Sequence, residues 1–327
     1  MNANLPAGIE PFLAAAGWTG AAVEPLPGDA SFRRYFRIRK GGQSAMLMFA
    51  PPPNEDPAPF LRAARWLDDN GLRAPIILHE AAAKGLVLLE DFGEVRMRDY
   101  LDEWPADEAE VYRGAVEALK ALHKVRPGPF MDYSLAEYQR ETKLFVDWYC
   151  PARNLYVDGA GWAAAWEEVL LPVLGSQRPG VTVLRDYHAE NIMLLGALEK
   201  QGLLDFQDAL VGHPAYDLVS LLQDARRDVA PEFEAEMMQH YLAGHPDPVR
   251  FVADYARLGA QRNAKIVGIF VRLWKRDGKP RYLSLIPRVW ALLERDLAHP
   301  ALAPVAAWFD ANIPAEVRAA GGGTLEP

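Results

Sequence analysis

The chain has 327 residues, of which 50% are hydrophobic and 24% are charged, and its formal net charge is −9. A chain of this size and composition can bury a large core and form two domains. The acidic balance without a concentrated basic stripe argues against a nucleic-acid partner. The single cysteine, Cys150, excludes an intrachain disulfide.

No membrane association is expected from the hydrophobicity pattern. Apolar runs without charges stay shorter than the ~18 residues that span a bilayer. Residues 1–20 lack the basic start of a signal peptide and contain Glu10. We therefore expect a cytoplasmic protein, and we expect it to act as a monomer.

The first ninety residues predict a small sheet with one helix. The predicted strands are residues 35–39, 45–49, 76–79 and 86–89. Residues 40–43 contain two adjacent glycines, which favour a hairpin turn between the first two strands. The proline-rich segment 51–57 must leave the sheet, because proline has no N–H to donate. Apolar residues at helical spacing over 58–70 predict the helix.

Beyond residue 91 the pattern becomes largely helical. The predicted helices cover residues 107–124, 134–149, 162–174, 231–243, 248–275 and 283–298. We therefore predict two lobes with a cleft between them. The N-terminal lobe, residues 1–91, is expected to bind a nucleotide, and the helical lobe, residues 92–327, to carry the catalytic loop and the substrate site.

The most informative segment lies between residues 182 and 208. An apolar run leads to Asp186, a polar loop ends at Asn191, and a second apolar run follows. A third apolar run, residues 202–204, ends in Asp205 and Phe206. The order Asp-x-x-x-x-Asn, then two hydrophobic residues and Asp-Phe, is the pattern of the catalytic loop and metal-binding segment of kinases.

Phosphoryl transfer explains why these residue types occur in this order. The reaction depends on positioning and charge neutralisation more than on covalent chemistry. Asp186 is predicted to accept or orient the proton of the attacking hydroxyl. Asn191 and Asp205 are predicted to bind Mg²⁺, which takes one or two protein oxygens together with phosphate oxygens. Each residue alone is common in turns, so the prediction depends on the ordered set. The expected cofactors are ATP and Mg²⁺.

These motifs resemble the aminoglycoside phosphotransferase/choline kinase superfamily. Its catalytic loop commonly reads His-x-Asp-x-x-x-x-Asn, whereas this chain has Leu184 at the first position and His188 inside the loop. Residues 213–218 resemble the superfamily's Asp-Pro-x-x-Asp-Leu segment, with His213 replacing the first aspartate. The resemblance implies an α+β, protein-kinase-like bilobal fold. It also implies that Asp217 supports the catalytic loop through backbone hydrogen bonds.

The resemblance also predicts where the nucleotide binds. Residues 26–36 occupy the position of the nucleotide loop, and residues 88–92 would present backbone groups to adenine. The predicted nucleotide-binding residues are Ser31, Phe32, Arg33, Arg34 and Glu90. Met48 stands where kinases usually carry a phosphate-binding lysine. We expect Arg33 or Arg34 to supply the missing positive charge.

One subgroup resembles the chain more closely: the bacterial anomeric kinases that phosphorylate N-acetylmuramate and N-acetylglucosamine at the 1-hydroxyl during cell-wall recycling. The similar stretches are residues 26–38, 48–56, 147–149, 185–191, 205–209, 261–265 and 278–282. The expected substrate-binding residues are Glu141, Trp148, His188 and Arg262. His188 either contacts the sugar or orders the loop, and Arg262 is the candidate partner for the lactyl carboxylate.

Two other functions remain open. The first is a kinase of another small alcohol, such as an aminoglycoside or a choline-like compound. A cationic substrate favours an acidic site, whereas Arg262 and Lys265 form a basic face on one predicted helix. The second is a nucleotide-binding pseudokinase that regulates a partner. Met48 favours this alternative, and the intact catalytic motif opposes it.

Overall fold

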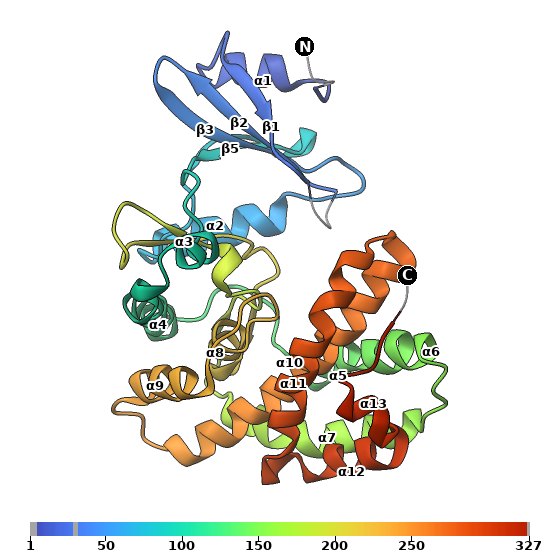
Figure 1. The fold of residues 1–327 in the computed structure, drawn as a ribbon. Coiled ribbons are helices and arrows are strands. Elements are labelled where there is room, and N and C mark those ends of the chain that lie inside the picture. The colour runs from blue at the N-terminus through green and yellow to red at the C-terminus, as the bar shows by residue number, and fades with distance from the viewer. Residues whose placement is uncertain (1–4, 29–31, 326–327) are drawn as a thin grey trace. The chain divides into compact units, whose positions relative to one another are not determined.

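The computed structural model describes residues 5–28 and 32–325 (Figure 1). Within these ranges the chain divides into two compact units. The first unit comprises residues 1–118 and 190–209, and the second comprises residues 119–189 and 210–327. Residues 190–209, which contain both predicted metal ligands, therefore belong to the unit that holds the large sheet. The predicted lobe boundary at residue 91 stays a prediction.

A five-stranded antiparallel sheet forms the centre of the first unit, with the order β1-β2-β3-β5-β4. The strands are β1 (Ala22–Pro25), β2 (Arg34–Lys40), β3 (Gln43–Phe49), β4 (Ile77–Ala81) and β5 (Leu86–Glu90). All four predicted strands are present, and β1 is an addition. Gly41 and Gly42 have φ angles of 56° and 81°, as a two-residue hairpin turn between β2 and β3 requires.

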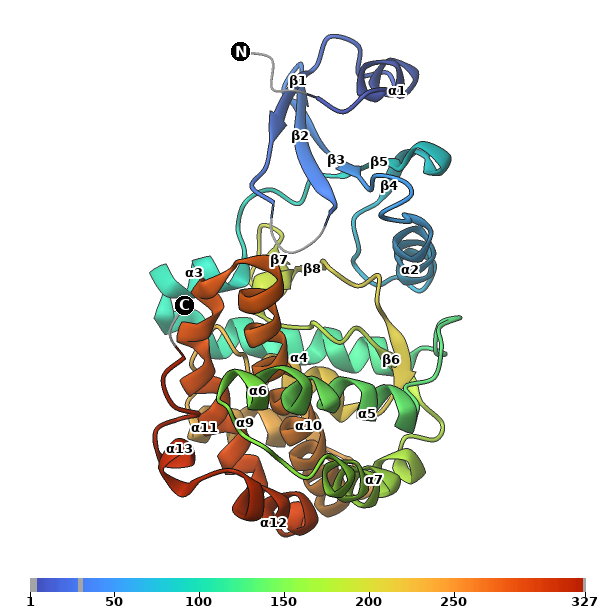
Figure 2. The same cartoon turned by 90° about the vertical axis from the view of Figure 1, so that its right-hand side faces the viewer.

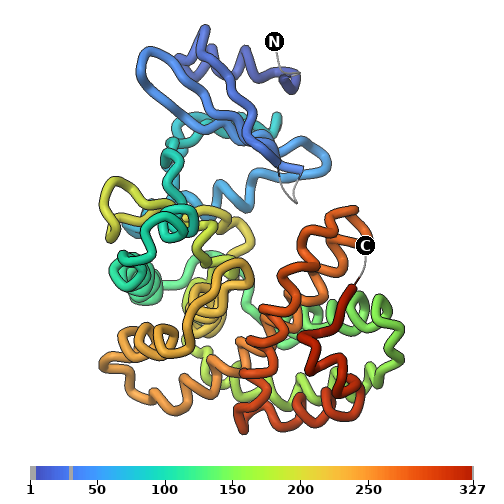
Figure 3. Tube along the Cα trace, viewed as in Figure 1, coloured from blue at the N-terminus to red at the C-terminus, as the bar shows by residue number. Residues whose placement is uncertain are grey.

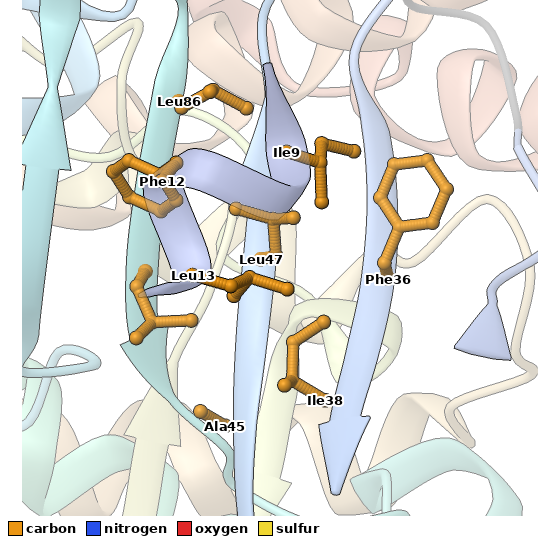
Figure 4. Packing of buried hydrophobic residues seen from close by; sticks show 9 residues of the cluster. Ile9, Phe12, Leu13, Phe36, Ile38, Ala45, Leu47 and Leu86 are labelled. Atoms are coloured by element: carbon orange, nitrogen blue, oxygen red, sulfur yellow. The ribbon is translucent and has the colours of Figure 1, made fainter. Parts of the chain in front are cut away.

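One face of this sheet is covered by α1 (Ile9–Ala15), a helix that the hydrophobic pattern did not predict. Figure 4 shows Ile9, Phe12 and Leu13 of α1 among side chains of the strands. Because side chains alternate along a strand, Phe36 and Ile38 reach this core, whereas Tyr35 lies on the opposite face. Tyr35 pairs in register with Met48, which places the Met48 side chain on that second face as well.

The remaining elements of the first unit carry the metal-binding segment. They are α2 (Ala58–Asp69), η1 (Ala82–Lys84), α3 (Met97–Glu103), η2 (Pro105–Asp107), the first part of α4 (Glu108–Lys124), and the hairpin of β7 (Ile192–Leu194) and β8 (Gln201–Leu203). Phe206, which follows the hairpin, stacks on Phe60 of α2 with ring centroids 5.1 Å apart. This packing fixes the backbone next to Asp205.

The second unit is helical apart from the short pair of β6 (Val181–Val183) and β9 (Leu210–Gly212) (Figure 2). Its helices are α5 (Leu135–Leu144), α6 (Cys150–Ala152), α7 (Gly159–Ser176), α8 (Ala215–Leu222), α9 (Pro231–Leu242), α10 (Pro248–Asp277), α11 (Ile286–Leu297), α12 (Ala303–Asn312) and α13 (Ala315–Ala319). Figure 3 follows the chain along α10 and back along α11. Both α5 and α8 pack against α10.

No helix in the described ranges combines the length and the apolar character needed to cross a membrane.

The predicted helix 134–149 is not one continuous α-helix. It consists of α5, which ends at Leu144, and a π-helical turn, η3 (Phe145–Tyr149). Such turns are rare and often lie at functional sites. Gly268 of α10 lets the two segments approach closely, because a Cβ there would collide with the backbone of Leu144. The turn therefore lies directly against α10.

Candidate active site

The catalytic loop is attached to α8 through Asp217. The backbone N–H of Leu184 donates to Asp217 Oδ2 at 2.6 Å, and that of Arg185 donates to Oδ1 at 2.8 Å. Arg185 has φ 73°, a left-handed conformation that costs ~1–3 kcal/mol in a residue other than glycine. The two hydrogen bonds offset this cost. The backbone immediately before Asp186 is thereby held in one conformation.

Asp186 has a carboxylate that is accessible and ionised. Its side chain is 46% exposed, and its Oδ1 atom lies 3.9 Å from Nη2 of Arg262. Partial burial opposes ionisation, but the charges of Lys265 and other nearby basic groups outweigh it and lower the pKa of Asp186. At neutral pH this carboxylate can accept a hydrogen bond or a proton from a hydroxyl.

Arg262 lies beside Asp186. It is 3% exposed, and its Nη2 atom donates to Ser220 Oγ at 2.8 Å. Its Nη1 atom is also buried and has no hydrogen-bond partner among the described residues. The expectation that Arg262 meets a carboxylate of the sugar stays untested. The structure shows instead that Arg262 is close to Asp186 and that its charge helps to lower the pKa of this carboxylate.

Glu141 is surrounded by protein donors. Its carboxylate is 1% exposed and accepts from Gln261 Nε2 at 3.0 Å, from Lys265 Nζ at 2.9 Å, and from Arg185 and the hydroxyl of Tyr133. Burial raises the pKa of Glu141, but the positive charges of Lys265 and Arg185 outweigh this effect and lower the pKa to about 2. Glu141 is therefore an anion that orients the basic groups behind Asp186.

The sequence pattern missed most of the network around Glu141. Gln261 is 120 residues from Glu141 along the chain, and no motif connects them. Lys265 was recognised only as part of a basic face with Arg262, although it is also one helical turn from Gln261. Arg185 is next to the predicted base, but the sequence pattern gave it no role of its own.

His188 and Trp148 differ in their surroundings. His188 is buried in the catalytic loop, and its backbone N–H donates to Asp186 O at 3.1 Å. Burial is the main cause of its lowered pKa, so the imidazole is neutral at pH 7. Trp148 lies on the π-helical turn η3 and is half-buried, which leaves part of the indole accessible.

Asn191 and Asp205 lie close together in the first unit. The pairing of Ile192 with Leu203 brings the two ends of the β7–β8 hairpin side by side, and the Asn191 amide is 3.4 Å from Asp205 Oδ2. Asp205 has φ 58°, and its Oδ1 accepts from Gln207 Nε2 at 2.7 Å. Strained backbone of this kind is common at functional sites.

A magnesium ion fits this pair of side chains. Rotation of the Asn191 amide directs its oxygen toward Asp205, so that the two residues offer two oxygen ligands. No group of three His, Cys, Asp or Glu side chains arranged for a metal occurs in the part of the chain that the structure describes. Mg²⁺ needs no such group, because most of its ligands are water and phosphate oxygens.

The two candidate arginines of the nucleotide loop lie on opposite faces of the sheet. Arg34 is exposed, and its guanidinium lies 5.1 Å from the centre of the Phe36 ring. Arg33 shares the other face with Tyr35 and forms an ion pair with Glu55, Nε to Oε2, at 3.4 Å. Burial lowers the pKa of Arg33, but nearby anionic groups, including Glu55 and Asp205, raise it overall. Arg33, unlike Arg34, is thus an electrostatic neighbour of a predicted metal ligand.

The other predicted nucleotide-binding residues give less information. Ser31 lies outside the described residues. Phe32 is exposed. The Glu90 carboxylate pairs with Arg73, Oε2 to Nη1, at 2.7 Å, and it also accepts from the N–H of Ile76 at 3.3 Å. These contacts hold the Glu90 side chain at the end of β5.

Comparisons with known proteins identify the family. The model of the phosphotransferase enzyme family matches residues 22–252. The chain belongs to this family. A curated relative from Caulobacter vibrioides, named N-acetylmuramate/N-acetylglucosamine kinase, is 38% identical over 94% of this chain and 96% of its own length. A protein of the same name from Pseudomonas aeruginosa is 39% identical over 91% of each chain.

Solved structures agree on the fold. A choline/ethanolamine kinase family protein from Mesorhizobium loti has a TM-score of 0.62 at 18% identity and covers 90% of this chain and 94% of its own. An ADP-bound aminoglycoside phosphotransferase has a TM-score of 0.57 at 15% identity and covers 88% of this chain and 97% of its own. The predicted superfamily, the α+β kinase-like fold and the phosphotransferase activity are confirmed.

Proposed function

We propose that this phosphotransferase transfers the γ-phosphoryl group of ATP to the anomeric 1-hydroxyl of N-acetylmuramate and N-acetylglucosamine. The names of the relatives that match more than nine-tenths of the chain support these two sugars. The observation that carries the proposal is the ionised Asp186 carboxylate between the charges of Arg262 and Lys265. Such basic surroundings suit a neutral or anionic acceptor better than a cationic aminoglycoside or choline.

Asp186 would act as the base. In the transfer a bond forms between the sugar's 1-oxygen and the γ-phosphorus, the bond from that phosphorus to ADP breaks, and the hydroxyl proton passes to Asp186. An anomeric hydroxyl is more acidic than an ordinary alcohol, so a carboxylate with a low pKa suffices. Asp217 would keep the loop in position through the two backbone amides that it binds.

The residues of the first unit would bind the nucleotide. Asn191 and Asp205 would hold Mg²⁺, which neutralises the phosphate charge that grows during transfer. Arg33 would take over the task of the lysine that Met48 replaces, and its ion pair with Glu55 would hold its guanidinium in place. Because ATP is the donor, we place the reaction in the cytoplasm, where it would serve the recycling of cell-wall sugars.

The sugar would be bound by residues of the second unit. The exposed part of Trp148 offers an apolar face to the sugar ring. His188 would order the loop or donate to a ring hydroxyl from its neutral imidazole. Glu141 has a complete set of protein partners, so we assign it a positioning role through Arg185 and Lys265.

Product analysis tests this proposal. The wild-type enzyme is incubated with ATP, Mg²⁺ and each sugar, and phosphorus–proton coupling in the NMR spectrum locates the phosphate. We expect a 1-phosphate from both sugars, and a loss of at least ~10²-fold in kcat for Asp186→Asn. The control is Asp228→Asn, which changes an exposed carboxylate paired with Arg288. A 6-phosphate, or turnover of an aminoglycoside alone, would contradict the proposal.

A further inference from the structure

Arg272 of α10 is a half-buried cation without a carboxylate partner among the described residues. Most of its basic neighbours have such a partner, and Lys275, for which the described ranges hold none, is exposed and lies over the Trp274 ring. Arg140 pairs with Glu137, Lys143 with Asp147, Lys265 with Glu141, and Arg276 with Asp277. Arg272 is half-buried and forms no hydrogen bond or ion pair within the described ranges, and its Nε atom is buried without a partner. Burial, followed by the charge of Arg276, lowers its pKa. A partly buried cation without a counter-ion is costly.

The position of Arg272 follows from the register between α10 and the segment of α5 and η3. Figures 1 and 2 show α5 beside α10, and three contacts align the two segments in the same direction. They are Gln261 to the carbonyl of Tyr138, Lys265 to Glu141, and Gly268 to the backbone of Leu144. One further turn along both segments brings Arg272 to the level of Trp148.

Arg272 also lies on the side of α10 that carries the basic groups near Asp186. It follows Arg262 by ten residues and Lys265 by seven, and these offsets put all three on one side of a helix. At 1.5 Å per residue, Arg272 is about 10 Å along the helix from Lys265, an electrostatic neighbour of Asp186. A sugar whose 1-hydroxyl meets Asp186 and whose ring extends along α10 toward its C-terminal end would bring the substituent on its 3-oxygen toward Arg272.

We propose that Arg272 recognises the lactyl carboxylate of N-acetylmuramate, with the ring of Trp148 beside it. This inference rests on the proposed function and adds the residue that distinguishes its two sugars. N-acetylmuramate is N-acetylglucosamine with a lactyl ether on its 3-oxygen, so only the former brings a carboxylate. A guanidinium binds a carboxylate through two parallel hydrogen bonds, and this one has no protein carboxylate to compete for it.

The test combines a substrate change with a residue change. Initial rates are measured for N-acetylmuramate, its methyl ester and N-acetylglucosamine, with wild type, Arg272→Met, Arg272→Lys and Arg276→Met. The methyl ester keeps the shape of the acid but not its charge. Arg276→Met is the matched control, because Arg276 is exposed, one turn further along α10 and paired with Asp277 at 2.8 Å. Thermal melts establish that each variant is folded.

We expect wild type to prefer the acid over its ester by roughly 10- to 100-fold in kcat/KM, the usual scale of a charged hydrogen-bonded pair. Arg272→Met should abolish this preference, mainly by raising KM for the acid, while N-acetylglucosamine changes by less than about 2-fold. Arg272→Lys should keep part of the preference. Arg276→Met should retain all of it.

Each contrary outcome has a definite meaning. Equal use of acid and ester by wild type, or an unchanged preference in Arg272→Met, overturns the inference and leaves the proposed function intact. An equal loss on all three sugars shows a structural role for Arg272 and also overturns it. If wild type phosphorylates neither sugar, the proposed function fails first, and this inference fails with it.

Discussion

The guanidinium of Arg262 lies 3.9 Å from the carboxylate of Asp186, measured from Nη2 to Oδ1. Arg262 is buried and hydrogen-bonded to Ser220, so its position is fixed, whereas the Asp186 side chain is half exposed. A fixed cation beside an accessible carboxylate favours the ionised form of that carboxylate. The charge of Arg262 therefore acts on the carboxylate that we propose as the base.

The first prediction follows from this contact. Arg262→Gln should lower kcat by at least about 10-fold, and by similar factors for N-acetylmuramate and N-acetylglucosamine, because it disturbs the base common to both reactions. Arg262→Lys should recover part of the rate. A coupled ADP-release assay measures both variants. A loss confined to N-acetylmuramate would instead assign Arg262 to the lactyl carboxylate.

The second prediction concerns the metal ligands. Asp205→Ala should lower kcat by at least ~10²-fold, because a carboxylate that holds the phosphate-bound cation is lost. Asn191→Ala should mainly raise the Mg²⁺ concentration needed for half-maximal rate. Glu199→Ala, an exposed change in the loop of the same hairpin, serves as the control. A Mg²⁺ titration of each variant decides, and an unchanged midpoint for Asn191→Ala would remove it from the metal site.

The third prediction separates Arg33 from Arg34. Arg33→Ala should weaken ATP binding by roughly 10- to 100-fold, as expected for the loss of a charge-assisted contact. Arg34→Ala should change it by less than about 2-fold, because Arg34 lies on the other face of the sheet over Phe36. Calorimetric titration with ATP measures both. Wild-type affinity in Arg33→Ala would show that the phosphate charge is neutralised elsewhere.

The fourth prediction is a dependence on pH that originates at Asp217. Burial raises its pKa to about 7, although the amides of Leu184 and Arg185 act in the opposite direction. Below that pH the protonated carboxyl can no longer accept both amides well, so the loop loosens. We expect kcat to fall as the pH drops from 8 to 6. The Asp217→Asn variant should be slower at every pH but should not show this decrease.

The same group should change stability in the opposite sense. Its pKa is higher in the folded chain than the ~3.9 of an unfolded aspartate, so the folded state holds the proton more tightly. The contribution of Asp217 to the free energy of unfolding is therefore fully present below pH ~4 and is lost as the pH rises to about 7. Urea unfolding of wild type and Asp217→Asn between pH 5 and 8 measures it. A free energy of unfolding that increases with pH in wild type relative to Asp217→Asn would contradict the assignment.

Much of the catalytic motif could be predicted because it is local. Asp186, Asn191 and Asp205 lie within twenty residues, in a loop and a hairpin whose apolar runs define the strands. Four of the five strands of the large sheet were also predicted, because alternation and the glycines of the β2–β3 turn are short-range signals, whereas β1 was missed. The α1 helix was missed, since seven residues give too few turns for a clear helical period.

The surroundings of the motif depend on contacts between distant parts of the chain. Alternation along the strand puts Arg33 on the same face as Tyr35, but only the pairing of β2 with β3 shows that this is also the face of Met48. The surroundings of Glu141 could not be predicted from the sequence for the same reason, because Gln261, which donates to its carboxylate, is 120 residues away along the chain. Residue type and spacing along the chain determined the catalytic chemistry. The packing of α5, α8 and α10 decided which charges surround Asp186, because residues far apart in the sequence come together only when the whole core packs.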